Sequence, residues 1–97
     1  MKQSLRAAAE DRRRKWWRRG FTLNTQVDPP GRHWTTHQHD VDEIVCLVEG
    51  ALDLQIGAEL HHAKANKETV IPRLTPHNLS NPGRHQTEYL YGFRSKK

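Results

Sequence analysis

The sequence predicts an all-β fold, a sandwich or barrel of short strands, preceded by one α-helix. After Gly20, short apolar segments alternate with turns rich in Gly, Pro and Asn, which is typical of such folds. Before Gly20, the chain contains no Gly or Pro and consists mainly of helix-forming residues. At 97 residues the chain can hold one domain, with a helical part at 1–20 and a β-barrel part at 21–97.

The expected helix covers residues 4–19. Ser4 can cap its start and Gly20 can end it. An apolar stripe at helical spacing consists of Leu5, Ala8, Ala9 and Trp16, and Arg12 interrupts it. Most of the net charge of +5 belongs to this segment, and the rest of the chain is close to neutral.

The expected strands follow from alternation and from turn residues. They cover residues 21–27, 33–39, 43–48, 51–56, 60–63, 70–71, 78–80 and 87–93. The third, at 44–48, is apolar on both faces, whereas a sheet with one wet face should alternate. Either the helix or a second subunit must cover its second face. Because the core of so short a chain is thin, we expect a homodimer.

Histidines gather in a pattern that suits a metal. In an extended strand, His37 and His39 lie on the same side, Glu43 follows four residues later, and His77 begins another expected strand. Three imidazoles and one carboxylate suit Zn, Fe, Mn, Ni, Co or Cu better than Mg or Ca. Taken alone, however, a pair of histidines two residues apart is more often a solvated pair on a surface strand.

The residues around these histidines follow a longer motif. Gly31, five residues, His37, one residue, His39, three residues, Glu43, six residues and Gly50 form one spaced set. This set resembles the first motif of the cupin family at all of its fixed positions.

A second set resembles the second cupin motif with two departures. Pro72, His77 and Asn81 have the expected spacing, while Asn66 and Leu74 replace two glycines. Asn tolerates a left-handed backbone better than most residues, so Leu74 is the larger departure.

The resemblance covers about residues 21–93 and implies a double-stranded β-helix, or jelly-roll, barrel. By position, it implies that His37, His39, Glu43 and His77 hold one divalent transition metal. The leading hypothesis is a small-molecule metalloenzyme or metal-dependent ligand binder of unassigned reaction, since cupin relatives include dioxygenases, isomerases, decarboxylases and sugar binders. A non-catalytic sensor or interaction module, with the basic helix contacting an acidic partner, is the alternative, and a purely structural metal is a third possibility.

Other chemically active side chains are expected to be structural. Cys46 should be a buried, inert thiol, and Arg73 should face solvent. The histidines outside the motif should be solvated, and they are His33, His61, His62 and His85. One face of the last expected strand consists of Thr87, Tyr89, Tyr91 and Phe93. We expect this stripe to pack in the core; the alternative is that Tyr89 or Tyr91 contacts a ligand.

The basic run at 12–19 admits two interpretations. Arginines beside tryptophans can bind nucleic acid, but charge runs are usually solvated faces, so we expect the helix to pack on the sandwich without forming a nucleic-acid site. No apolar run has the length of a membrane span, and no apolar leader is present, so a cytoplasmic location is expected.

Overall fold

The computed structural model describes residues 3–95, apart from the side chains of Thr36 and His37. The expected all-β fold with an N-terminal helix is confirmed. The elements are α1 (Leu5–Arg18), β1 (Asn24–Asp28), β2 (His33–His37), β3 (Glu43–Glu49), β4 (Asp53–Ile56), β5 (Glu59–His62), β6 (Glu68–Ile71), β7 (His77–Ser80) and β8 (Thr87–Phe93). No helix within residues 3–95 is long and apolar enough to cross a membrane.

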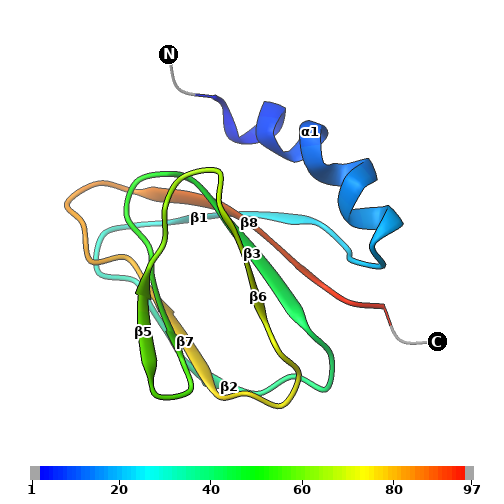
Figure 1. The fold of residues 1–97 in the computed structure, drawn as a ribbon. Coiled ribbons are helices and arrows are strands. Elements are labelled where there is room, and N and C mark those ends of the chain that lie inside the picture. Colours follow the sequence, from blue (N-terminus) through cyan, green and yellow to red (C-terminus); the bar gives the residue numbers. More distant parts are fainter. Residues whose placement is uncertain (1–2, 96–97) are drawn as a thin grey trace.

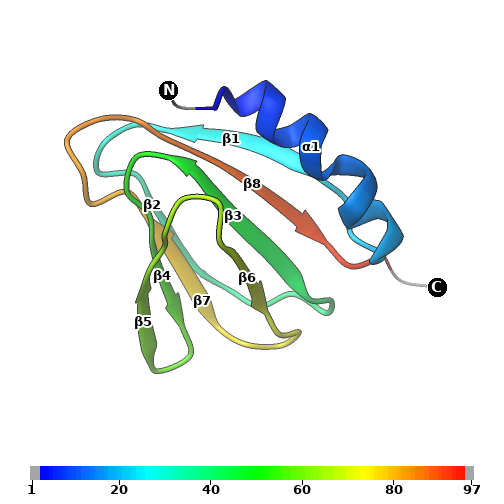
Figure 2. The ribbon, with the colours of Figure 1, turned by 45° about the horizontal axis from the view of Figure 1, so that its top comes forward.

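The strands form two four-stranded antiparallel sheets that face each other (Figure 1). One sheet has the order β1-β8-β3-β6 and the other has the order β2-β7-β4-β5. Neighbours in each sheet are mostly far apart in sequence, so each sheet depends on contacts between distant segments. The helix lies along the outer side of the sheet that contains β1 and β8, as Figure 2 shows.

Strand β3 has a separate apolar layer on each face, which explains its continuous apolar run. Between the sheets, Val45 and Leu47 pack with Leu54 and Leu79. On the other face, the side chains of β3 pack against the helix, in a cluster formed by Ala8, Ala9, Trp16, Phe21, Ile44, Cys46, Val48 and Leu90. The helix therefore covers the second face of β3, and a homodimer is not needed for that purpose.

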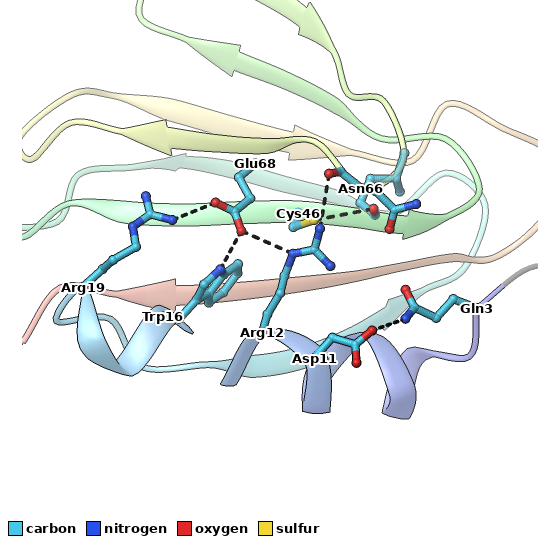
Figure 3. Close-up of polar contacts among 9 residues, drawn as sticks. Gln3, Asp11, Arg12, Trp16, Arg19, Cys46, Asn66 and Glu68 are labelled. Atoms are coloured by element: carbon cyan, nitrogen blue, oxygen red, sulfur yellow. Dashed lines mark hydrogen bonds and ion pairs between the residues drawn. The ribbon is translucent and has the colours of Figure 1, made fainter. Parts of the chain in front are cut away.

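Polar contacts fasten the helix at one acidic residue of β6 (Figure 3). Glu68 accepts hydrogen bonds from Trp16 Nε1 at 2.8 Å and from Arg19 at 2.8 Å. Arg12, which interrupts the apolar stripe, donates to the same carboxylate at 3.2 Å and to the carbonyl of Asn66 at 3.2 Å. Glu68 is therefore the shared acidic partner of Arg12 and Arg19.

A glycine in β8 allows the segment after the helix to approach the sheet. A Cβ on Gly92 would lie 1.8 Å from the carbonyl oxygen of Thr22 and 3.4 Å from the ring of Trp16. Thr22 also exchanges hydrogen bonds with the main chain of Phe93. The contact between α1 and β8 therefore depends on the absence of a side chain at position 92.

The outer face of the helix is basic and carries one exposed aromatic ring. Trp16 is fully buried, whereas Trp17 is 71% exposed. Trp17 shares a shallow hollow with Arg13 and Arg14, both of which are exposed. The prediction that the helix packs on the sandwich is confirmed. This packing leaves Arg13, Arg14 and Trp17 exposed side by side.

Candidate metal centre

Three of the four expected ligands converge on one point between the sheets. Nε2 of His77 lies 3.0 Å from Oε1 of Glu43, and Nε2 of His39 lies 3.6 Å from the same oxygen. One ligand atom from each of the three residues lies within 4.8 Å of the others. Two ligands that each lie about 2.1 Å from one ion are about 3.0–3.4 Å apart, so the spacing of Glu43 and His77 suits a shared ion, while Nε2 of His39 lies slightly outside this range.

Each of the three residues is positioned by a different part of the fold. Glu43 is the first residue of the inner strand β3, where it pairs with Phe93 on one side and Ile71 on the other. His77 is the first residue of β7. His39 follows β2, which ends two residues earlier than the sequence predicted, at His37. Beyond His37, the main chain of His39 and the side chain of Gln38 bond to Leu74, in the loop before β7.

The contacts of Glu43 and His77 meet the requirements of two ligands that share one metal ion. Oε1 of Glu43 is buried, and among the described residues it receives no aligned hydrogen bond. Nδ1 of His77 lies 3.0 Å from the carbonyl oxygen of Thr75, to which only an N–H can donate. In the neutral ring this leaves the lone pair on Nε2, facing Glu43, as metal-binding histidines require.

Burial also changes the acidity of Glu43. Desolvation raises the pKa of its carboxyl group above the ordinary value, and the nearby His77 opposes part of that shift. An isolated carboxylate is costly to bury, whereas a cation beside it offsets the cost. The donor set of two imidazoles and one carboxylate therefore fits a divalent transition metal.

The fourth expected ligand is His37. Its side chain lies outside the described part of the structure, so its role as a ligand stays a prediction. Its backbone pairs with that of His77 in the ladder between β2 and β7.

A pocket of about 160 Å³ adjoins the three converging residues. Two strands of each sheet supply the rest of the lining, which is largely aromatic. These lining residues are Gln26, Trp34, Leu79, Tyr89 and Tyr91. Tyr89 and Tyr91 thus pack in the core, as expected for this stripe, and they also line a cavity. Pockets for drug-sized ligands measure about 300–1,000 Å³, so this pocket suits a smaller molecule.

Sequence reasoning missed the residue that organises the pocket wall, Asp28. We expected Asp28 to begin a turn, yet it ends β1 and is 1% exposed. Its carboxylate accepts hydrogen bonds from Gln26 at 2.7 Å, Trp34 Nε1 at 2.9 Å and the hydroxyl of Tyr89 at 2.9 Å. Asn81, the last residue of the second motif, donates to its main-chain carbonyl. An Asp before two prolines usually indicates a turn, so no signal in the sequence marked it as buried.

The remaining predicted residues are structural, as expected. Arg73 is exposed and pairs with Asp40 at 3.0 Å, outside the pocket lining. Cys46 is fully buried, and desolvation raises the pKa of its thiol, which keeps it protonated and unreactive. The four histidines outside the motif are exposed, namely His33, His61, His62 and His85.

Two antiparallel sheets enclosing a histidine and glutamate cluster define a double-stranded β-helix protein with a candidate metal centre. The family profile described as "Cupin domain" matches residues 24–93, so the chain belongs to the cupin family. The matched segment contains the whole candidate centre and leaves α1 outside it. No curated protein sequence matches the chain.

Solved structures share this fold at low sequence identity. The cupin domain of Schizosaccharomyces pombe Cnp3 has a TM-score of 0.71 at 15% identity, covering 79% of this chain and 54% of that one. Oxalate oxidase in complex with the substrate analogue glycolate has a TM-score of 0.71 at 24% identity, with coverages of 80% and 43%. DMSP lyase DddQ from Ruegeria pomeroyi DSS-3 has a TM-score of 0.70 at 18% identity, with coverages of 79% and 39%. This chain thus spans about half or less of each of these structures, and the likeness concerns the fold.

Proposed function

We propose that this chain binds one divalent transition metal through His37, His39, Glu43 and His77, and binds a small molecule beside it. The observation that carries the proposal is the buried Oε1 of Glu43, which receives no aligned hydrogen bond from the described residues and faces Nε2 of both His39 and His77. His37 enters through its place in the first cupin motif. The metal could be Zn, Fe, Mn, Ni, Co or Cu, since imidazole and carboxylate ligands suit all of them.

The pocket supports a small-molecule role over a purely structural metal. A metal that only stabilised the fold would need no cavity beside it, whereas this site borders a cavity lined by aromatic residues. When bound, the metal would supply Lewis acidity, or dioxygen activation if it is iron. The chain's own residues would bind the ligand between aromatic rings and exclude bulk water. Oxalate oxidase and the DMSP lyase are enzymes of similar fold, which makes catalysis a reasonable proposal without naming the reaction.

Calorimetric titration with Zn²⁺ tests the ligand set. We expect one site per chain in the wild type, and loss of that site in His39→Ala, Glu43→Gln and His77→Ala. His61→Ala is the matched control because His61 is exposed and lies outside the cluster. His37→Ala tests the ligand that rests on the motif alone. Equal Zn²⁺ affinity in the wild type and in His77→Ala would refute the proposed centre.

A second candidate function concerns the outer face of α1, and one observation favours it. Trp17 is exposed beside Arg13 and Arg14, with Arg18 also exposed on the helix. Their charge is complementary to that of an acidic protein segment, which we propose as the partner. A polyglutamate peptide serves as the probe, titrated at low and high salt, because screening weakens such contacts.

The basic face is tested with charge reversal. We expect Arg13→Glu combined with Arg14→Glu to abolish peptide binding, while Arg84→Glu, an exposed arginine outside the helix, leaves it intact. Single-stranded DNA is titrated in parallel. Tighter binding of DNA than of the peptide would replace the acidic protein partner with nucleic acid, and no binding of either would refute an interaction surface here.

A further inference from the structure

The candidate metal centre borders the pocket, and the buried acid Asp28 lies behind another part of the wall, where it bonds three of the lining residues. On β8, Phe93 pairs with Glu43 at the metal end, and its ring contacts His39 with centroids 4.9 Å apart. Tyr89 lies four residues earlier on the same strand, about 13 Å away along it. Tyr91, between them, brings its ring to 5.9 Å from Phe93 and 6.4 Å from Tyr89. A ligand that reaches the metal can therefore extend along this row of rings toward Tyr89.

Asp28 determines which hydrogen-bonding groups the far wall can offer. A carboxylate only accepts hydrogen bonds, so Gln26 must turn one N–H of its amide toward Asp28, which leaves its carbonyl oxygen and its second N–H. Trp34 has a single N–H, which Asp28 takes. Tyr89 donates its only hydroxyl proton to Asp28 and keeps just lone pairs. Burial, together with Asp28 beside it, raises the pKa of Tyr89, so the phenol stays protonated and keeps that orientation.

The wall also lacks a cation. Among the described residues that line the pocket, none is Lys or Arg. Arg32 stacks over the ring of Trp34 at 4.1 Å from its centroid, but it is exposed and is not part of the lining. A ligand carboxylate at this end would meet the lone pairs of Gln26 and Tyr89 and would be repelled by Asp28, because like charges in a low dielectric interact strongly.

We infer that the ligand carries a hydroxyl or amino group at the end opposite its metal-binding group, and donates a hydrogen bond from it to Gln26 and Tyr89. The inference rests on the proposed metal site, since the metal would hold the ligand's other end. Asp28 is then a positioning residue that fixes the wall as an acceptor. The apolar middle of the ligand packs against Leu79 and Tyr91.

Four small acids that differ only at one end test this specificity. The probes are 4-hydroxybutanoate, 4-methoxybutanoate, butanoate and succinate, added to the Zn²⁺-loaded chain. The side-chain N–H signals of Gln26 and Trp34 in NMR spectra report binding. We expect 4-hydroxybutanoate to bind about five- to tenfold more tightly than the other three, as one hydrogen bond allows. Butanoate is smaller than the hydroxy acid and 4-methoxybutanoate is larger, and neither carries the terminal donor. A preference for the hydroxy acid over both therefore does not come from size.

Asp28→Asn separates a positioning role from a merely structural one. The N–H of Trp34 can only donate, so the new Asn must place its amide oxygen toward Trp34. The amide nitrogen of the Asn then donates a hydrogen bond to the side-chain carbonyl of Gln26. Gln26 would then use its carbonyl oxygen within the wall and keep both N–H donors for the ligand, so the preference would shift from the hydroxy acid toward the methoxy acid. Asp53→Asn is the matched control, because Asp53 contacts His62 at 2.7 Å and does not line the pocket. This variant should retain the wild-type preference.

The outcomes distinguish this inference from the proposed function. Elemental analysis measures the zinc content of each sample. A chain that retains no zinc would show that zinc does not occupy the proposed site, and the same probes are then compared on the metal-free chain. Equal affinity for the hydroxy and methoxy acids, or a preference for succinate, would overturn the acceptor wall even with zinc bound. If Asp28→Asn does not fold, Gln26→Leu replaces it and should remove the preference for the hydroxyl group.

Discussion

The backbone amide of Leu74 donates a hydrogen bond of 2.8 Å to the carbonyl oxygen of His39, and Leu74 does so with a left-handed backbone, φ 61°. The carbonyl of Leu74 in turn accepts from the side chain of Gln38 at 3.0 Å. The loop before His77 is thus connected to the segment that carries His39. A residue other than glycine pays a conformational cost of about 1–2 kcal/mol in this region.

We therefore predict that Leu74→Gly stabilises the protein by up to about 1 kcal/mol, because glycine adopts this backbone freely but gains entropy when unfolded. Urea unfolding measures the change. Leu60→Gly is a matched control, since Leu60 is also 55% exposed but lies in the regular strand β5. The control should lose about 0.5–1 kcal/mol. Destabilisation of equal size in both variants would show that the left-handed backbone carries no strain.

The second prediction concerns the close approach at Gly92. Gly92→Ala should lower the free energy of unfolding by about 3 kcal/mol, because its Cβ would overlap the main-chain oxygen of Thr22 and displace the segment after the helix. Gly31→Ala is the comparison, because a Cβ there meets nothing within 4 Å and only the positive φ of 82° opposes it. Its expected cost is about 1–2 kcal/mol, the cost of a left-handed backbone for a residue with a Cβ. Thermal unfolding with equal losses in both variants would contradict the close packing of α1.

The third prediction is a dependence of stability on pH that arises from Glu68. Burial raises the pKa of Glu68, but the hydrogen bonds from Trp16 and Arg19 outweigh it and bring the net pKa below the ordinary 4.5. A lowered folded-state pKa favours the ionised form, so this stabilisation is present above pH 4.5 and is lost as the pH falls through the folded-state pKa.

Glu68→Gln removes that titration. At neutral pH the variant should be less stable by about 1 kcal/mol, a modest figure because the side chain is 28% exposed. The difference between wild type and variant should shrink on acidification, as measured by urea unfolding at about pH 6 and pH 3. A difference that stays constant with pH would mean that the charge of Glu68 does not hold the helix.

The homodimer stays a prediction after the structure is considered. Because the helix covers the outer face of β3, the expected homodimer is now supported by the thin core and no longer by that strand. Edge strands still expose apolar side chains, with Val27 on β1 at 46% and Val70 on β6 at 40%. Sedimentation velocity at micromolar concentration should give a dimer. A monomer under those conditions would show that these edges remain uncovered in solution.

Periodicity and turn residues predicted the strands and the helix, because they report local physics. Ser4 caps α1 by accepting from the amide of Ala7 at 3.1 Å, as its position suggested. The motif glycines also have a physical basis, since Gly31 and Gly50 have φ of 82° and 94°. The two residues that replace glycine in the second motif, Asn66 and Leu74, likewise have positive φ. The departures in sequence therefore leave the shape of the loop intact.

The candidate site was only partly predictable. The positions of His39, Glu43 and His77 followed from the motifs, because spacing within a known barrel determines which strand ends meet. Asp28 could not be found in this way. Its burial depends on partners that only the fold brings near, such as Tyr89, which is sixty-one residues away. For the same reason Glu68 was not recognised as the anchor of the helix.

Elemental analysis of the chain, purified without an affinity tag, tests the metal centre most directly. After dialysis against Zn²⁺, Mn²⁺, Fe²⁺, Ni²⁺, Co²⁺ or Cu²⁺ in turn, we expect one ion of at least one of these metals per chain. The loaded protein should be more stable than the metal-free protein by about 2.7 kcal/mol at a metal concentration 100 times the dissociation constant. His77→Ala should retain neither the ion nor the added stability. A wild-type chain that binds none of the six metals, or a His77→Ala variant that binds as well as wild type, would contradict the metal centre.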